Sequence, residues 1–322
     1  MSTDGLPTHV VAFGNQKGGV TKTSTVVNLA AALSERGKKV LVFDLDVNCG
    51  STRLFGVPQG VNVYGTYEVM LSDELPQDVV IRPGDMDTVN LPENVHLIPA
   101  HTKLEGIESA LANQQGPFAS SNDSLQAPIA SLKGQYDYIF LDTSPSMTPP
   151  TKAAYMVAQY FVLTAVPERL AIEGLVNAIQ YIKHARKGGN QDLRLMGVVM
   201  NQVPGRATRL STALIEEVDK HFSAGDEYMR RYESSISAST IVPTVQQGGK
   251  TLFEEAPDHK VTQQYRDLAE EFESRFDKLT APNTDAGPAD QADPTNGQAK
   301  VQINPNLTVP QPAGNAEGVV NG

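Results

Sequence analysis

A glycine-rich turn between an apolar run and a helical pattern constrains this chain more than any other feature. The turn, residues 14–24, reads Gly-Asn-Gln-Lys-Gly-Gly-Val-Thr-Lys-Thr-Ser; the apolar run 10–13 precedes it, and an alanine- and leucine-rich pattern follows over 26–33. Strand, glycine turn and helix in this order are typical of a phosphate-binding loop, in which backbone N–H groups and the helix N-terminus face an anion. The order therefore predicts a strand–loop–helix unit with a phosphate site at its turn.

Two lysines give the turn its chemistry. Lys22 is expected to reach the terminal phosphates of a nucleotide, and the hydroxyl of Thr23 is expected to ligate Mg²⁺. Lys17 is a second cation that a simple phosphate loop lacks, and it adds charge aimed at the same phosphates. The alternative is a Gly-Gly turn with two solvated lysines, because Gln16 and Thr21 occupy the glycine positions of the pattern G-x-x-x-x-G-K-[ST].

Acids that would complete the site follow two further apolar runs. The first run ends at Asp44 and Asp46, and the second ends at Asp142. In an open parallel sheet, ligands bind outside the carboxyl ends of the strands. We therefore expect Asp46 to orient a water or hold Mg²⁺ through water, Asp142 to bind Mg²⁺, and Asp44 to be structural. The alternative for each is an ordinary aspartate at the end of a strand.

Short apolar runs alternate with helical patterns, which is typical of an α/β protein with a mainly parallel sheet and helices on both faces. The predicted strands are 9–14, 39–45, 94–98, 136–142, 160–166, 194–201 and 241–245. The predicted helices are 23–36, 65–72, 123–133, 150–159, 171–187, 208–222 and 260–279, with a polar loop at 112–124.

The expected organisation is one large domain between two short ends. Residues 1–8 form a short extension, 9–279 form the α/β domain, and 280–322 form a tail. The tail is rich in Pro, Gly, Asn, Ala and Asp and lacks apolar periodicity, so we expect it to be disordered.

Composition excludes several classes of protein. A single cysteine, Cys49, excludes internal disulfides and cysteine-rich metal sites. We see no signal peptide and no membrane-length apolar run, which favours a cytoplasmic protein. The net charge of −11 is the wrong sign for a surface that attracts nucleic acid as a whole, so any DNA contact must come from a local basic patch.

Taken together, the motifs resemble those of ParA-type partition ATPases, in the deviant-Walker (MinD/ParA) branch of P-loop proteins. The resemblance covers about 9–279 and implies the P-loop α/β fold. It is carried by Lys17–Thr23, the acids Asp44 and Asp46, the segment 99–108 with its Pro99 and Leu104, the segment Asp142–Ser146, and the segment Val166–Gly174.

The resemblance implies an ATPase that uses ATP and Mg²⁺. Lys17 would cross to the partner subunit's ATP in a nucleotide-sandwich homodimer, and hydrolysis would be slow. The implied catalytic residues are Lys17, Lys22 and Asp46, and the implied metal ligands are Thr23, Asp46 and Asp142. The implied nucleotide-binding residues are Lys17, Gly18, Gly19, Val20, Thr21, Lys22, Thr23, Ser24 and, more remotely, Asn201.

The resemblance also implies partners. The ATP dimer of the family binds double-stranded DNA without sequence preference, and a ParB-type centromere-binding protein stimulates hydrolysis and release, so we expect a nucleoid-associated protein. The basic residues in the comparable part of this chain are Arg206, Arg209, Arg230, Arg231 and Lys250. The alternative is that these are ordinary solvated side chains.

Three departures from the family pattern bear on turnover rather than on ATP binding. Thr21 replaces a glycine, Val47-Asn48 stand where Pro-Gln is usual, and Ser144 replaces a proline. They leave open a nucleotide-binding scaffold with little hydrolysis. A MinD-like ATPase that positions itself or a protein cargo is a further alternative, but the acidic last helix, 260–279, argues against adsorption to an anionic membrane.

Overall fold

A parallel sheet organises the part of the chain that the computed structural model describes, residues 7–58, 63–115, 121–222 and 229–280. Its six strands are all parallel and lie in the order β3-β2-β4-β1-β5-β6. The strands are β1 (His9–Gly14), β2 (Val40–Asp44), β3 (Val95–Ile98), β4 (Tyr138–Asp142), β5 (Tyr160–Ala165) and β6 (Arg194–Met200). The predicted α/β class with a parallel sheet is confirmed.

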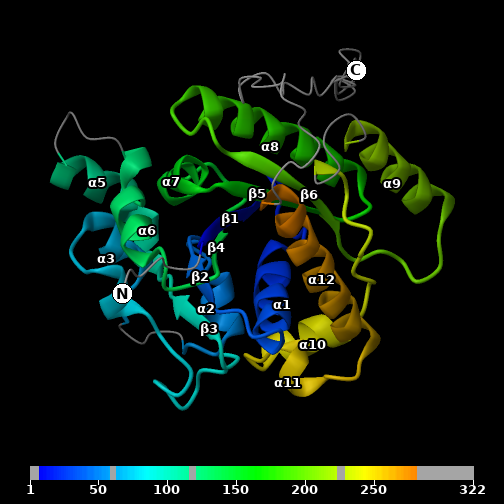
Figure 1. The fold of residues 1–322 in the computed structure, drawn as a ribbon, viewed down its shortest axis with the longest axis horizontal. Coiled ribbons are helices and arrows are strands. Elements are labelled where there is room, and N and C mark those ends of the chain that lie inside the picture. The colour runs from blue at the N-terminus through cyan, green and yellow to red at the C-terminus, as the bar shows by residue number, and fades with distance from the viewer. Residues whose placement is uncertain (1–6, 59–62, 116–120, 223–228, 281–322) are drawn as a thin grey trace, which may run out of the picture.

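Helices cover both faces of this sheet (Figure 1). In the first half of the chain they are α1 (Lys22–Glu35), α2 (Gly50–Leu54), α3 (Thr66–Leu71), α4 (Pro76–Val79), η1 (Thr102–Gly106), α5 (Ile107–Gln115), η2 (Ser121–Asp123) and α6 (Gln126–Leu132). In the second half they are α7 (Pro149–Val157), α8 (Arg169–Lys187), α9 (Arg209–Phe222), α10 (Ile241–Gln247), α11 (Leu252–Glu255) and α12 (Lys260–Thr280).

The strands are apolar throughout because both of their faces are buried. On β1, Val10 and Ala12 pack into the core beneath α6, α7 and α8, whereas Val11 and Phe13 pack into the core beneath α1 and α12. The two cores hold the strands rigidly in register. Asp44 and Asp142 are therefore direct neighbours at the carboxyl ends of β2 and β4.

Short segments cover both edges of the sheet. At the β3 edge, Ile81 and Leu97 exchange two backbone hydrogen bonds of 2.8 and 2.9 Å. At the β6 edge, the amides of Tyr232 and Ile236 donate to the carbonyls of Val198 and Met200 at 2.8 and 2.9 Å. Covered edges of this kind have few open backbone groups for another strand to join.

Two predictions of local structure are wrong. Residues 241–245 lie in helix α10 rather than in a strand; Pro243 in its first turn has no N–H to give a strand ladder, and a helix start tolerates that loss. The predicted loop 112–124 overlaps α5, which runs to Gln115, and η2. The predicted tail lies outside the described residues, apart from Thr280. Within the described part, no helix combines the length and the apolar character needed to span a bilayer.

Candidate nucleotide site

The glycine-rich loop joins β1 to α1 through a left-handed turn. Gly19 has φ of 78°, and Thr21, the residue before α1, has φ of 59° and ψ of 29°. This region is unfavourable for a β-branched residue, at a cost of about 1–2 kcal/mol. The glycine position that Thr21 fills therefore does require a left-handed backbone, and the loop carries strain beside the α1 N-terminus.

Asn15 fastens the loop to α8. Its side chain is 2 % exposed and donates to the carbonyls of Thr164 and Ala171 at 2.7 and 3.4 Å, while its Oδ1 accepts from the amide of Lys17 at 2.9 Å. Gly174 of α8 lies so close that a Cβ there would sit 2.1 Å from this Oδ1. A glycine at position 174 is thus required by the approach of the loop.

Lys22 is buried among acids. It is 7 % exposed, and burial lowers the pKa of its ammonium, while the charges of Asp142 and Asp46 oppose that shift. The structure therefore brings Lys22 together with the two acids, Asp46 and Asp142, that the sequence placed at the phosphate end of the sheet.

Lys17 is held by its own chain. Its ammonium forms an ion pair with Glu168, the residue just before α8, and the two side chains are 26 % and 60 % exposed. The ion pair is solvated enough to exchange for another anion at small cost. The sequence motif contained Glu168 but gave no reason to pair it with Lys17.

Asp142 has the environment of a metal-binding carboxylate. It is fully buried; its Oδ2 accepts from the Ser51 hydroxyl at 2.6 Å, while its Oδ1 has no hydrogen-bond partner among the described residues. Burial raises its pKa to about 6, and the Ser51 and Thr23 hydroxyls and the Lys22 charge oppose that rise. The Thr23 hydroxyl and the unpaired carboxylate oxygen of Asp142, side by side at a phosphate loop, fit Mg²⁺, which prefers oxygen ligands.

Asp44 and Asp46 have different surroundings. Asp44 is fully buried and accepts from the amide and hydroxyl of Thr52 at 2.9 and 2.7 Å, as expected of a structural acid. Burial first, and then the charge of Asp142, raises its pKa to about 7. Asp46 accepts from both the amide and the side chain of Asn48, at 3.0 and 2.9 Å.

The family profile described as an AAA domain matches residues 8–195. The chain is 31 % identical over 262 residues to the sporulation initiation inhibitor protein Soj of Bacillus subtilis, covering 81 % of this chain and 97 % of that protein. It is 32 % identical over 265 residues to the chromosome-partitioning ATPase Soj of Thermus thermophilus, covering 82 % and 95 %. The chain belongs to the ParA/Soj family of P-loop ATPases. The predicted resemblance is confirmed.

A solved structure of the same fold contains a nucleotide. Cobyrinic acid a,c-diamide synthase from Mycobacterium smegmatis, with bound ADP and magnesium, has a TM-score of 0.65 and 27 % identity, and the match covers 82 % of this chain and 93 % of that one. The likeness agrees with the oxygen-rich surroundings of Asp142.

The remaining nucleotide candidates of this ParA/Soj-family chain line the same end of the sheet. Val20 is fully buried against Val166 and Ala171, whereas Gly18 and Gly19 are exposed. The Ser24 hydroxyl accepts from the Gln246 side chain at 2.7 Å. Asn201, directly after β6, is 1 % exposed; its Oδ1 lies 3.3 Å from the Thr25 hydroxyl, and its Nδ2 has no partner in the described part of the chain.

The basic candidates do not form one cluster. Arg206, Arg209 and Arg230 are exposed, but Arg231 makes two hydrogen bonds to Asp219, of 2.6 and 3.0 Å, and Lys250 pairs with Glu254 and Glu255. Ten residues of α9 separate Arg209 from Asp219, which is about 15 Å of helix. Residues 206–209 and 230–231 therefore lie toward opposite ends of α9.

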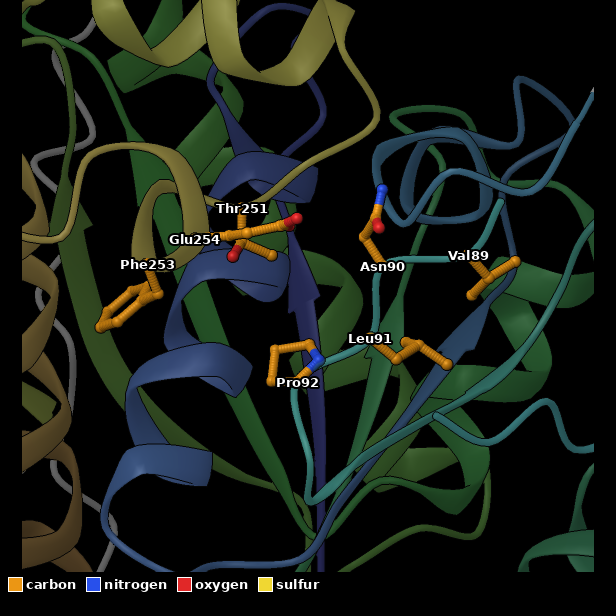
Figure 2. Close-up of a pocket in the computed structure, with 7 residues that line it drawn as sticks. All are labelled: Val89, Asn90, Leu91, Pro92, Thr251, Phe253 and Glu254. Carbon is orange, nitrogen blue, oxygen red and sulfur yellow. The ribbon is translucent and has the colours of Figure 1, made fainter. Parts of the chain in front are cut away.

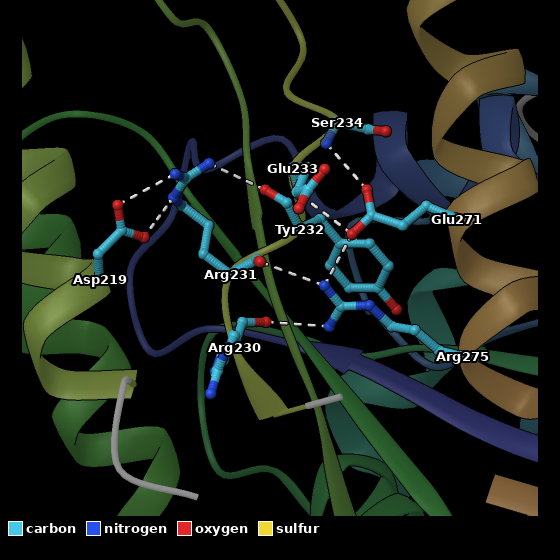
Figure 3. A network of polar contacts seen from close by, with 8 residues as sticks. All are labelled: Asp219, Arg230, Arg231, Tyr232, Glu233, Ser234, Glu271 and Arg275. Carbon is cyan, nitrogen blue, oxygen red and sulfur yellow. Dashed lines mark hydrogen bonds and ion pairs between the residues drawn. The ribbon is translucent and has the colours of Figure 1, made fainter. Parts of the chain in front are cut away.

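A buried arginine fixes the segment that carries Arg230 and Arg231 (Figure 3). Arg275 of α12 donates to the carbonyls of Arg230 and Arg231 at 2.9 and 3.1 Å and to Glu271 at 2.8 Å. Its guanidinium lies 3.6 Å from the centre of the Tyr232 ring. Glu271 in turn accepts from the amides of Glu233 and Ser234. Arg275 and Glu271, two charged side chains of α12, therefore both bind the backbone of this segment.

A separate surface pocket lies beside α11 (Figure 2). It is lined by Val89, Asn90, Leu91, Pro92, Thr251, Phe253 and Glu254. None of the predicted site residues lines it, so the pocket takes no part in the nucleotide site.

Proposed function

We propose that the protein is an ATP-dependent DNA-segregation ATPase. The single observation that carries the proposal is the convergence of Lys22 with Asp46 and Asp142 at a phosphate loop. The buried ammonium and the unpaired Oδ1 of Asp142 are complementary to Mg·ATP. Partition proteins are among the relatives, and the Soj protein of Thermus thermophilus is described as a chromosome-partitioning ATPase.

Each side chain has a role that its position supports. Lys22 binds the terminal phosphates, and the amides of 17–24 with the α1 N-terminus hold the rest of the phosphate chain. Thr23 and Asp142 would hold Mg²⁺, Asp46 would reach it through water, and the metal would neutralise negative charge on the phosphates. Asp46 orients the attacking water in line with the γ-phosphate. The Nδ2 of Asn201 is an unused donor for the nucleotide base.

The proposed homodimer depends on the charge of Lys17. In the single chain its ammonium is neutralised by Glu168. In the ATP-bound homodimer Lys17 exchanges this carboxylate for the phosphates bound by the other subunit, so nucleotide charge drives association. Hydrolysis then removes the charge that holds the dimer together.

The dimer binds double-stranded DNA without sequence preference, and a ParB-type centromere-binding protein stimulates hydrolysis and release at the nucleoid. Arg206, Arg209 and Arg230 are the exposed candidates, whereas Arg231 and Lys250 must first leave their acidic partners. Each phosphate contact changes the slope of log affinity against log salt by about 0.9. Arg206→Ala should therefore weaken binding equally on all sequences and flatten that slope; unchanged affinity and slope would exclude Arg206.

The strain at Thr21 favours a second candidate, a nucleotide-binding scaffold with little turnover. Phosphate release with and without DNA, measured beside a Lys22→Ala variant, separates the two. DNA-stimulated release above that variant supports the ATPase. ATP binding without release above the variant supports the scaffold, and no ATP binding refutes both.

A further inference from the structure

One short segment donates a hydrogen bond to every acid of the site. Asn48 donates to Asp46, Ser51 donates to Asp142 at 2.6 Å, and Thr52 donates to Asp44. The segment 48–52 comprises the turn after β2 and the start of α2, and Ser51 and Thr52 are 0 % and 4 % exposed. Three carboxylates at the ends of β2 and β4 thus each accept a hydrogen bond from one of five consecutive residues.

In both Asp46 and Asp142, the hydrogen bonds from this segment go to only one of the two carboxylate oxygens. Both donors of Asn48, its amide and its side chain, go to Oδ1 of Asp46, and no described residue donates to Oδ2. Ser51 takes Oδ2 of Asp142 and leaves the buried Oδ1 without a partner. Each acid therefore has one oxygen held by the protein and one left for a ligand.

The segment is itself locked in place. The amide of Cys49 donates to the carbonyl of Asp46 at 2.8 Å, and Cys49 has φ of 53°, so the chain turns sharply before α2. Gly50 then packs on the phosphate loop helix, where a Cβ would lie 2.9 Å from the Thr23 hydroxyl oxygen. The donors are thereby fixed with respect to both the acids and the loop.

We propose that segment 48–52 is the positioning element of the carboxylates, in which Ser51 sets the Mg²⁺ ligand Asp142 and Asn48 sets the water-orienting Asp46. The two residues touch neither nucleotide nor metal and act through the acids. This inference rests on the proposed function, because the acids are positioned for ATP hydrolysis. It adds Ser51, which the sequence motifs did not indicate, and gives a role to Asn48, which the sequence marked only as a departure from the family pattern.

Ser51 is tested through metal-dependent nucleotide binding, which needs no turnover. Removal of a partner that orients a metal ligand typically weakens metal affinity by about 10–100-fold. Ser51→Ala should raise the Mg²⁺ concentration for half-maximal binding of a fluorescent ATP analogue by about tenfold, with unchanged binding in EDTA. Ser51→Cys has a side chain of similar size with a weaker donor, so its half-maximal Mg²⁺ concentration should lie between those of the wild type and Ser51→Ala. An unchanged Mg²⁺ midpoint in Ser51→Ala, with a native circular-dichroism spectrum, would overturn this role.

Asn48 is tested by a double-mutant cycle on turnover. Asn48→Ala should lower kcat by about tenfold with ATP affinity unchanged, because the orientation of Asp46 is lost. It should shift the Mg²⁺ midpoint less than Ser51→Ala does, because Asp46 reaches Mg²⁺ only through water. In an Asp46→Asn background the same substitution should cost nothing further. A full additional loss in that background would show that Asn48 does not act through Asp46, and an unchanged kcat in the single variant would refute the proposal directly.

The control is Arg53→Ala, the next residue of α2, whose exposed side chain contacts none of the three acids. It should match the wild type in both assays. If the wild-type protein binds ATP without hydrolysing it, the proposed ATPase function fails while the Ser51 assay still reports on positioning. If the wild type turns over and neither variant differs from it, the positioning role fails alone.

Discussion

Gly174→Ala tests whether the packing of α8 against the phosphate loop governs the site. The added Cβ would lie 2.1 Å from Oδ1 of Asn15 and 3.3 Å from the amide nitrogen of Lys17. An ordinary C···O contact is about 3.3–3.6 Å, so the Asn15 oxygen must move by more than about 1 Å. The move breaks its hydrogen bond to the Lys17 amide, which costs about 1–3 kcal/mol when no other acceptor replaces it.

Two effects on stability then oppose each other. Replacement of glycine by alanine inside a helix gains about 1 kcal/mol, so the net loss in the free energy of unfolding is at most about 2 kcal/mol. Function should suffer far more, because a misplacement of about 1 Å at a reacting centre costs about 100-fold in rate. If the loop moves together with Asn15, the Gly174→Ala variant should therefore still fold but be almost inactive.

The assay pairs urea denaturation with nucleotide binding and phosphate release. Gly106→Ala is the matched control, because a Cβ at Gly106 meets nothing within 4 Å. That variant should bind and hydrolyse ATP like the wild type. If Gly174→Ala is more stable than the wild type and retains turnover within twofold, the loop does not depend on this contact and the reasoning is wrong.

Three other predictions follow from charges in the structure. Arg275→Leu should lower the free energy of unfolding by about 3–5 kcal/mol, because it removes the buried guanidinium from its hydrogen-bond network. Arg266→Leu should lower it by less than about 1 kcal/mol, because the ion pair of Arg266 with Glu35 is more exposed. Equal losses in the two variants would contradict the argument. Glu168→Gln should release Lys17, change stability by less than about 0.5 kcal/mol and strengthen ATP-dependent dimerisation severalfold by light scattering; unchanged dimerisation would refute it. Asp44 binds a proton more tightly in the folded protein, so its contribution to stability falls as pH rises from about 4 to about 7, and Asp44→Asn should flatten that decline in urea titrations without metal.

The strands and the phosphate loop could be predicted because their signals are local. Runs of apolar residues identify strands buried on both faces, and all six observed strands lie within predicted runs. The sequence shows Thr21 at a glycine position of the loop pattern, and its φ of 59° shows that the backbone there is left-handed. Lys22 with Asp46 and Asp142 converge as expected, because the carboxyl ends of parallel strands meet at one edge of the sheet.

The residues that the sequence did not reveal act through side-chain geometry. Ser51 and Thr52 follow the acids at no diagnostic spacing, and only the path of the turn through Cys49 turns them back toward Asp142 and Asp44. The pairing of Lys17 with Glu168 joins residues far apart in the chain, and nothing in either local segment specifies it. The strand predicted at residues 241–245 was wrong for a different reason, because a short apolar run is compatible with either a strand or a helix.

The left-handed turn at Cys49 gives this protein an internal reporter. Cys49 is the only cysteine among the 322 residues, so a thiol reagent labels this turn alone, without any substitution. The thiol is half-buried, and burial raises its pKa to about 11, so little thiolate exists at neutral pH and alkylation should be slow. The rate of that labelling, followed by mass spectrometry as nucleotide is added, therefore reports any change in the exposure of the segment next to the acids in the unmodified chain.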